Sequence, residues 1–332
     1  MTPSPLRIHG AKLLPLLACV ALGSLTVAVC TGSGEVGALD LIDLLRGQAD
    51  TGTRDILLKL RLPRSLAAFG TGASLALAGV LMQVLLRNPL ADPYILGTSG
   101  GAAVAALLAM LAGAGVLITD LSAFGGALGS TLIVFLIARS RGNWAPGRLL
   151  LTGVVIAAGW GALISLILAL SPAANLRGML FWLMGDFSFA HNPVPSLAAA
   201  ALALGAGLTL ARSLNVLATG DQQATLLGLR IRPVRAGIYL LSALLTSVAV
   251  TTAGTVGFIG LVVPHLIRLV SGADHRTLVP GAALAGGSLL VIADTLARTV
   301  IAPRQLPVGA ITAMIGVPLF LFLLGRSAGT KD

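Results

Sequence analysis

The sequence predicts an all-α membrane protein that crosses the bilayer about ten times. Of its 332 residues, 56% are hydrophobic and only 10% are charged, and the mean hydropathy is +0.95. A soluble globular domain carries roughly 25% charged residues, so water would solvate this chain poorly. The apolar residues stand in continuous runs of about 20, the length that a helix needs to cross the hydrocarbon core. A transmembrane β-barrel would instead need alternating segments of about ten residues.

The apolar runs place the expected helices in order along the chain. The first run extends to Thr31, longer than the core of a signal peptide, so we expect an uncleaved helix. The run at 257–270 is short and contains His265 and Arg268. No segment between the runs is long enough for a soluble domain, so residues 1–332 are expected to form a single transmembrane domain. The expected helices are 13–31, 63–86, 94–112, 116–138, 149–170, 193–211, 235–254, 257–270, 278–297 and 308–325.

The basic residues predict the orientation of these helices. With both termini cytoplasmic, fourteen of the 22 Lys and Arg residues lie inside, in agreement with the positive-inside rule. The net charge of +10 therefore resides in loops and forms no basic stripe of the kind that binds nucleic acid. Five of the outside residues gather at 46–64, an exception that needs its own explanation. The outside residues are Arg46, Arg54, Lys59, Arg61, Arg64, Arg177, Arg298 and Arg304.

Two loops between the runs are expected to contain short helices. In the cytoplasmic loop 212–235, Asp221 is a suitable N-cap and Gly228 suits the left-handed residue that ends a helix, which predicts about two turns between them. The external loop 170–193 contains Trp182 and several phenylalanines, which is typical of a helix at the membrane interface.

The stretch RNPLADPYILGTSGGAA, residues 87–103, interrupts the apolar pattern with polar residues and prolines. Pro89 and Pro93 disfavour a continuing helix, so the chain is expected to turn here. The sequence GTSGGA at 97–102 resembles a phosphate-binding loop but lacks its lysine, and helix packing is the better interpretation.

The chemistry expected of an enzyme is absent from this sequence. None of the three lysines precedes Ser or Thr, which excludes the GxxxxGK[ST] loop, and no nucleophile stands in a recognisable pattern with its base. Among the ionisable residues within the runs we single out His265, Arg268 and Asp294, all near helix ends. A proton-coupled carrier usually needs such groups at the bilayer midplane. A substrate moved by an external motor fits this distribution better.

Several long stretches of the chain closely resemble one family of membrane proteins. They are 61–103, 254–298 and 306–324, and the stretches 176–188 and 217–229 also match. The family comprises the FecCD or vitamin B12-type permease subunits of type II ABC importers.

This resemblance implies a fold of ten transmembrane helices in the cytoplasmic (inner) membrane of a bacterium. It also implies a second permease subunit, identical or related, two ATP-binding subunits and an extracytoplasmic substrate-binding protein. The chain would bind no cofactor or metal itself, and the partner ATPase would use ATP and Mg. The implied cargo is a ferric siderophore, with haem and cobalamin as alternatives. An ion-coupled secondary transporter is the alternative of a different class.

The resemblance also implies roles for particular residues. Asn88 and Leu90 match residues that line a cytoplasmic gate, although an ordinary turn is the other interpretation. Arg61, Arg64 and Arg298 match arginines that dock the binding protein, although they could anchor helix ends at lipid headgroups. The residues matching the element that couples to the ATPase are Gly220, Asp221, Ala224, Leu227 and Gly228. The chain departs from the family at Arg304-Gln305, where relatives commonly carry an acidic residue.

Overall fold

A computed structural model describes residues 10–32, 36–139, 146–188, 190 and 192–328 of the chain. Each helix expected from the sequence corresponds to a helix in this structure. They are α1 (Gly10–Cys30), α4 (Leu62–Leu86), α5 (Thr98–Leu111), α6 (Val116–Arg139), α7 (Pro146–Leu170), α9 (Val194–Thr209), α12 (Ile231–Ala253), α13 (Ile259–Ser271), α14 (His275–Thr299) and α15 (Val308–Ala328).

Length and composition divide these helices into two groups. Among the described residues, six helices are long and apolar enough to cross a membrane alone. A seventh crossing is formed by α9 together with α10 (Ala211–Ala218), which meet at a bend of 67°. The apolar helices α5, α13 and α15 are shorter. Together the two groups agree with the expected number of about ten crossings.

Further helices lie between the crossings. The expected helices of the two loops are present as α8 (Ala173–Met184) and α11 (Asp221–Leu226). The sequence did not indicate α2 (Ala38–Leu45), nor that α4 continues upstream through α3 (Thr51–Asp55) and the π-helical turn η1 (Ile56–Arg61). A proline lacks the amide that an α-helix needs, so a helix start near Pro63 was the natural prediction. The wider turn of η1, in which the Leu62 amide bonds the Leu57 carbonyl, lets the helix pass through this position.

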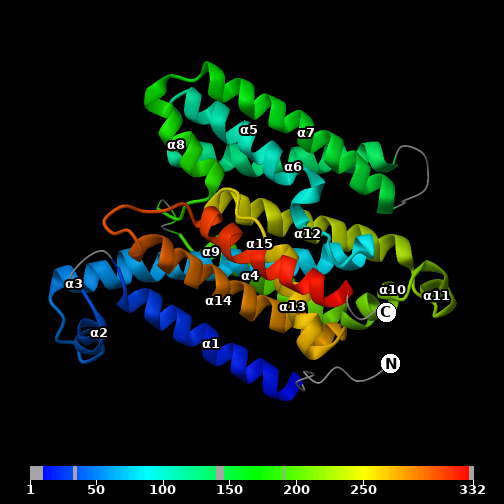
Figure 1. Ribbon diagram of the computed structural model, residues 1–332, viewed down its shortest axis with the longest axis horizontal. Helices are drawn as coiled ribbons and strands as arrows, with labels where there is room; N and C mark the ends of the chain where they lie inside the picture. Colours follow the sequence, from blue (N-terminus) through cyan, green and yellow to red (C-terminus); the bar gives the residue numbers. More distant parts are fainter. Residues whose placement is uncertain (1–9, 33–35, 140–145, 189, 191, 329–332) are drawn as a thin grey trace.

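The helices pack around α4, which is the most buried crossing. It contacts α14, α12, α9 and α13, while α5 packs on α6 and α7 as a second group that α12 joins to the first. Figure 1 shows this second group, with α8, above the rest of the molecule. In the same view α10, α11, the start of α1 and the end of α15 lie on the right, opposite α2 and α3. The predicted topology requires the start of α1 and the end of α15 to lie at the α11 end.

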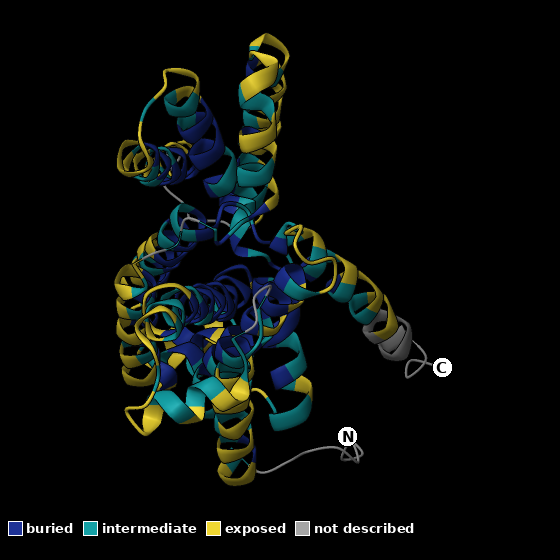
Figure 2. Cartoon of the chain, turned by 90° about the vertical axis from the view of Figure 1, so that its left-hand side faces the viewer, coloured by how far each residue is buried: buried dark blue, intermediate teal, exposed yellow. Residues whose placement is uncertain are grey.

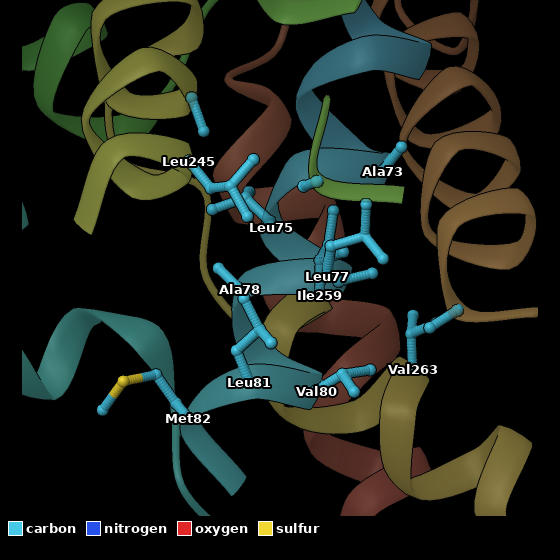
Figure 3. Packing of buried hydrophobic residues seen from close by; sticks show 14 of the residues in the cluster. Ala73, Leu75, Leu77, Ala78, Val80, Leu81, Met82, Leu245, Ile259 and Val263 are labelled. Atoms are coloured by element: carbon cyan, nitrogen blue, oxygen red, sulfur yellow. The ribbon is translucent and has the colours of Figure 1, made fainter. Parts of the chain in front are cut away.

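Small residues bring the central helices close together. A Cβ added to Gly79 of α4 would lie 1.9 Å from the Gly260 carbonyl of α13, and one added to Gly72 would lie 2.2 Å from the Gly286 carbonyl of α14. Neither site has room for a side chain. Leucines and valines such as Leu75 fill the remaining space (Figure 3). Exposed residues line the outward faces of the helices (Figure 2), where apolar side chains would meet lipid.

Candidate functional site

The turn between α4 and α5 holds the two predicted gate residues. Arg87 ends α4 in the left-handed conformation, with φ of 49°. Asn88 follows at once, and its Oδ1 accepts a hydrogen bond of 2.9 Å from the Leu90 amide. Asn88 is half-buried and Leu90 is 40% exposed. The side chain of Asn88 therefore sets the backbone path that presents Leu90.

A short 3-10 helix, η2 (Pro93–Leu96), completes this turn. Asp92 caps it by accepting a hydrogen bond of 2.8 Å from the Tyr94 amide. Burial raises the pKa of the Asp92 carboxyl to about 6, against the opposing effect of that hydrogen bond. Tyr94 in turn accepts at its hydroxyl from the Val256 amide, between α12 and α13. The helix ends before the two prolines as predicted, and Tyr94 attaches the turn to the segment between the end of α12 and the start of α13.

The predicted coupling element is α11, a six-residue helix at one end of the molecule. Gly220 precedes it with φ of 109°, and Gly228 follows it with φ of 79°, the left-handed value that the sequence predicted. Ala224 is fully buried, whereas Leu226 and Leu227 are 87% and 68% exposed. The helix therefore rests on the membrane part through Ala224 and presents two adjacent leucines outward.

The predicted capping role of Asp221 is wrong. Gly220 occupies the N-cap position, and Asp221 is the first residue within α11. Its Oδ1 accepts a hydrogen bond of 2.6 Å from Arg235 Nη2, near the start of α12. The same oxygen lies 3.8 Å from Arg87 Nη1. A cap would need the carboxylate to face the helix amides, and these two arginines attract it in another direction.

The three arginines predicted to dock a binding protein lie together at the end of the molecule opposite α11, which is the outer end in the predicted orientation. Arg64 makes hydrogen bonds to both oxygens of Asp294, the shortest being 2.7 Å from its Nη2. Arg298 lies one turn after Asp294 on α14, with its Nε 3.1 Å from Oδ2. Asp294 is 1% exposed, so one buried carboxylate is shared by two guanidinium groups.

Arg61 and Arg298 also hold the outer end of α1. Arg61 Nη1 donates to the carbonyls of Val29 and Val36, each at 2.9 Å. Arg298 donates to the carbonyls of Ala28 and Thr31 at 3.1 and 3.4 Å. The last carbonyls of a helix have no partner within it, and here the two guanidinium groups supply one. Both arginines are less than 10% exposed.

The departure at Arg304-Gln305 lies beside this cluster. Gln305 Oε1 accepts from Arg64 Nη1 at 3.2 Å and lies 2.7 Å from Ser188 Oγ. Arg304 is exposed. The outer end thus carries several arginines, one buried carboxylate and a neutral amide where the family commonly has an acid.

Comparison with known protein families identifies the family to which the chain belongs. A model of the FecCD transport family matches residues 18–326, nearly the whole chain. The chain belongs to the FecCD transport family. It is thus a multi-pass membrane protein of a transport family.

Individual members of the FecCD family resemble the chain along most of its length. The hemin transport system permease protein HmuU of Yersinia pestis is 44% identical over 96% of this chain and 98% of its own. The Fe(3+) dicitrate permease protein FecD of Escherichia coli is 40% identical, over 82% and 85%. A solved metal-chelate type ABC transporter, in an inward-facing conformation, superimposes with a TM-score of 0.84 at 30% identity, covering 95% of this chain and 99% of that one.

Three residues were missed in the sequence, of which Leu226 and Arg87 belong to these sites and Asp120 does not. Leu226 is more exposed than Leu227, and an adjacent pair of leucines in a polar loop was the signal for it. Arg87 was counted only as a cytoplasmic charge, yet it joins the gate turn to α11. Asp120 lies near the outer end of α6, and an acidic residue within an apolar run was visible in the sequence.

Proposed function

We propose that the chain is the permease subunit of an ATP-driven importer that moves a large metal chelate across the cytoplasmic membrane by alternating access. The observation that carries this proposal is the FecCD family match along residues 18–326. The solved metal-chelate transporter of similar fold supports the same class of cargo. In this proposal both termini and α11 are cytoplasmic, and a second permease subunit completes the pathway.

The exposed leucines of α11 support a contact with the ATPase. Leu226 and Leu227 form a small apolar surface that would be costly to leave in water, and a cleft on an ATP-binding subunit would cover it. Ala224, Gly220 and Gly228 give this helix a fixed shape, as a moving partner requires. Replacing both leucines with Asp should abolish ATP-driven uptake while the permease still inserts into the membrane.

The outer arginine cluster supports docking of a substrate-binding protein. Arg64 and Arg298 share the single negative charge of Asp294, which leaves one positive charge in excess in this group, and the neutral Gln305 adds no negative charge. The excess positive charge would attract acidic residues on the partner. Arg61 and Arg298 also hold α1, so Arg64, which is 12% exposed and bonds the exposed Gln305, is the best placed for direct contact. Arg64→Gln should lower the affinity of the binding protein most strongly at low salt.

The cargo we propose to test first is haem. The similarity to the hemin permease extends over 96% of this chain, whereas the iron dicitrate permease matches 82% of it. A ferric siderophore and cobalamin are the other chelates of the same importer class. Asn88 and Leu90 would form the cytoplasmic gate for any of them.

Reconstitution in liposomes tests this function. The chain is inserted alone, or with its ATP-binding subunits and binding protein, and uptake of haem, ferric siderophore and cobalamin is followed with and without ATP. Uptake that needs the partners and ATP supports the proposal and identifies the cargo. Uptake by the chain alone, driven by an ion gradient, would establish a secondary transporter instead.

A further inference from the structure

The carboxylate of Asp221 lies where three structural elements meet. It belongs to α11, it accepts a 2.6 Å hydrogen bond from Arg235 of α12, and it lies 3.8 Å from the guanidinium of Arg87 at the end of α4. α11 is the proposed contact with the ATPase, and Arg87 immediately precedes the proposed gate residue Asn88. The side chain of Asp221 thus connects α11 with the turn that carries the proposed gate.

The two ion pairs of Asp221 differ in strength. Arg235 is only 7% exposed, and its bond to Asp221 is short, so this pair holds α11 firmly to α12. Arg87 and Asp221 are 39% and 40% exposed, and their charged atoms are farther apart. A separated, half-exposed pair is weak and screened by salt, so it can break and form again at low cost.

The backbone of Arg87 makes the gate turn sensitive to this weaker pair. Arg87 adopts a left-handed conformation, which is unfavourable for a residue other than glycine and persists only when its surroundings hold it. The Asn88 amide bonds the Gln83 carbonyl, and the Ala91 amide bonds the Asn88 carbonyl, so the turn is built directly on Arg87. A change at Arg87 therefore alters the position of Asn88 and Leu90.

We propose that Arg87 is a positioning residue that links α11 to the gate through Asp221. When the ATPase displaces α11, Asp221 moves with it and, through its short bond to Arg235, so does the start of α12. The distance between Asp221 and Arg87 then changes, and this change at Arg87 repositions the turn that carries Asn88 and Leu90. This inference rests on the proposed function, because it assigns a path between the motor and the gate of that transporter.

The test measures coupling in the complete transporter, reconstituted with its ATPase and binding protein. Uptake of the transported chelate and ATP hydrolysis are measured on the same liposomes for the wild type, Arg87→Gln, Arg87→Lys and Arg276→Gln. Arg276 is an exposed arginine in the first turn of α14, outside the α11 contacts, and serves as the matched control. Insertion and thermal stability in detergent are checked for each variant.

The proposal expects Arg87→Gln to lower uptake per ATP hydrolysed at least about fivefold, while hydrolysis stays within about twofold of the wild type. Arg87→Lys retains the charge and should recover most of this ratio, and Arg276→Gln should leave it unchanged. A wild-type ratio in Arg87→Gln, or an equal loss of uptake and hydrolysis in Arg87→Gln and Arg87→Lys, would overturn the inference and leave the proposed function intact. A wild-type complex without ATP-dependent uptake of any chelate would overturn both.

Discussion

Each end of this molecule has one aspartate that lies between two arginines, but the two groups have different surroundings. At the outer end, Asp294 lies between Arg64 and Arg298, and at the α11 end, Asp221 lies between Arg235 and Arg87. The outer carboxylate is 1% exposed, whereas that of Asp221 is 40% exposed. The chemical groups are identical, so the difference lies in burial and in the distances between the charges.

Burial decides whether such a group is fixed or can be switched. A buried carboxylate between two guanidinium groups cannot leave without exposing unpaired charges in an apolar environment, which is costly. A half-exposed carboxylate can exchange one arginine for water at little cost. The outer group therefore acts as a rigid joint between α4, α14 and α1. The group at α11 combines one fixed pair with one that can open.

Removing the carboxylate of Asp294 is expected to have the largest effect on the free energy of unfolding. Asp294→Asn leaves Arg64 and Arg298 buried without a counter-charge, and the expected loss is about 3–5 kcal/mol of unfolding free energy. Unfolding by SDS titration in mixed micelles measures it. The control is Asp55→Asn, because the pair of Asp55 with Lys59 is exposed and should cost less than about 0.5 kcal/mol. Equal losses of unfolding free energy in the two variants would show that Asp294 does not hold the helices together rigidly.

Releasing the end of α1 is expected to have the second-largest effect on the free energy of unfolding. Arg61→Gln removes the hydrogen bonds to the Val29 and Val36 carbonyls and leaves both ion pairs of Asp294 in place. We expect a loss of about 2 kcal/mol, the typical magnitude for hydrogen bonds from a charged group. Hydrogen exchange should also accelerate near the end of α1. Slow exchange there in the variant would contradict a holding role for Arg61.

The two ends also differ in how far the sequence could predict them. Helix positions followed from the apolar runs, and the left-handed Gly228 followed from its place after a short helix, because both are local properties. The partners of Asp221 were missed because Arg235 and Arg87 approach it only in the folded chain. The family resemblance indicated Arg61, Arg64 and Arg298, and Arg298 stands four residues after Asp294, the spacing of a helical ion pair. The bond from Arg64, 230 residues before Asp294, had no local sign in the sequence. Long-range charge pairing has no periodicity that a sequence could display.

Neutralising the carboxylate at α11 should affect coupling more than stability. Asp221→Asn removes a half-exposed charge but keeps a side-chain oxygen that can accept from the buried Arg235, so the expected loss of unfolding free energy is about 1–2 kcal/mol, below that of Asp294→Asn. Uptake per ATP hydrolysed should fall at least as much as in Arg87→Gln, because the contact with Arg235 is weakened as well. The same SDS titration and liposome assays give both values. A destabilisation as large as that of Asp294→Asn would place Asp221 among the rigid contacts instead.

The smallest expected effect is that of ionic strength, which should change the coupling at the α11 end and leave the stability of the outer end unchanged. Raising the ionic strength from about 0.1 M to 1 M shortens the Debye length from roughly 10 Å to 3 Å, which screens exposed charges and leaves buried pairs nearly unchanged. The stability conferred by Asp294 should therefore stay constant, while uptake per ATP hydrolysed in the wild type should fall about twofold. Docking at the outer arginines is also sensitive to salt, so the binding protein is kept at a saturating concentration. In Arg87→Gln the ratio should no longer respond, because the pair that salt screens is already absent. An equal response in the wild type and in this variant would assign the salt effect to another contact.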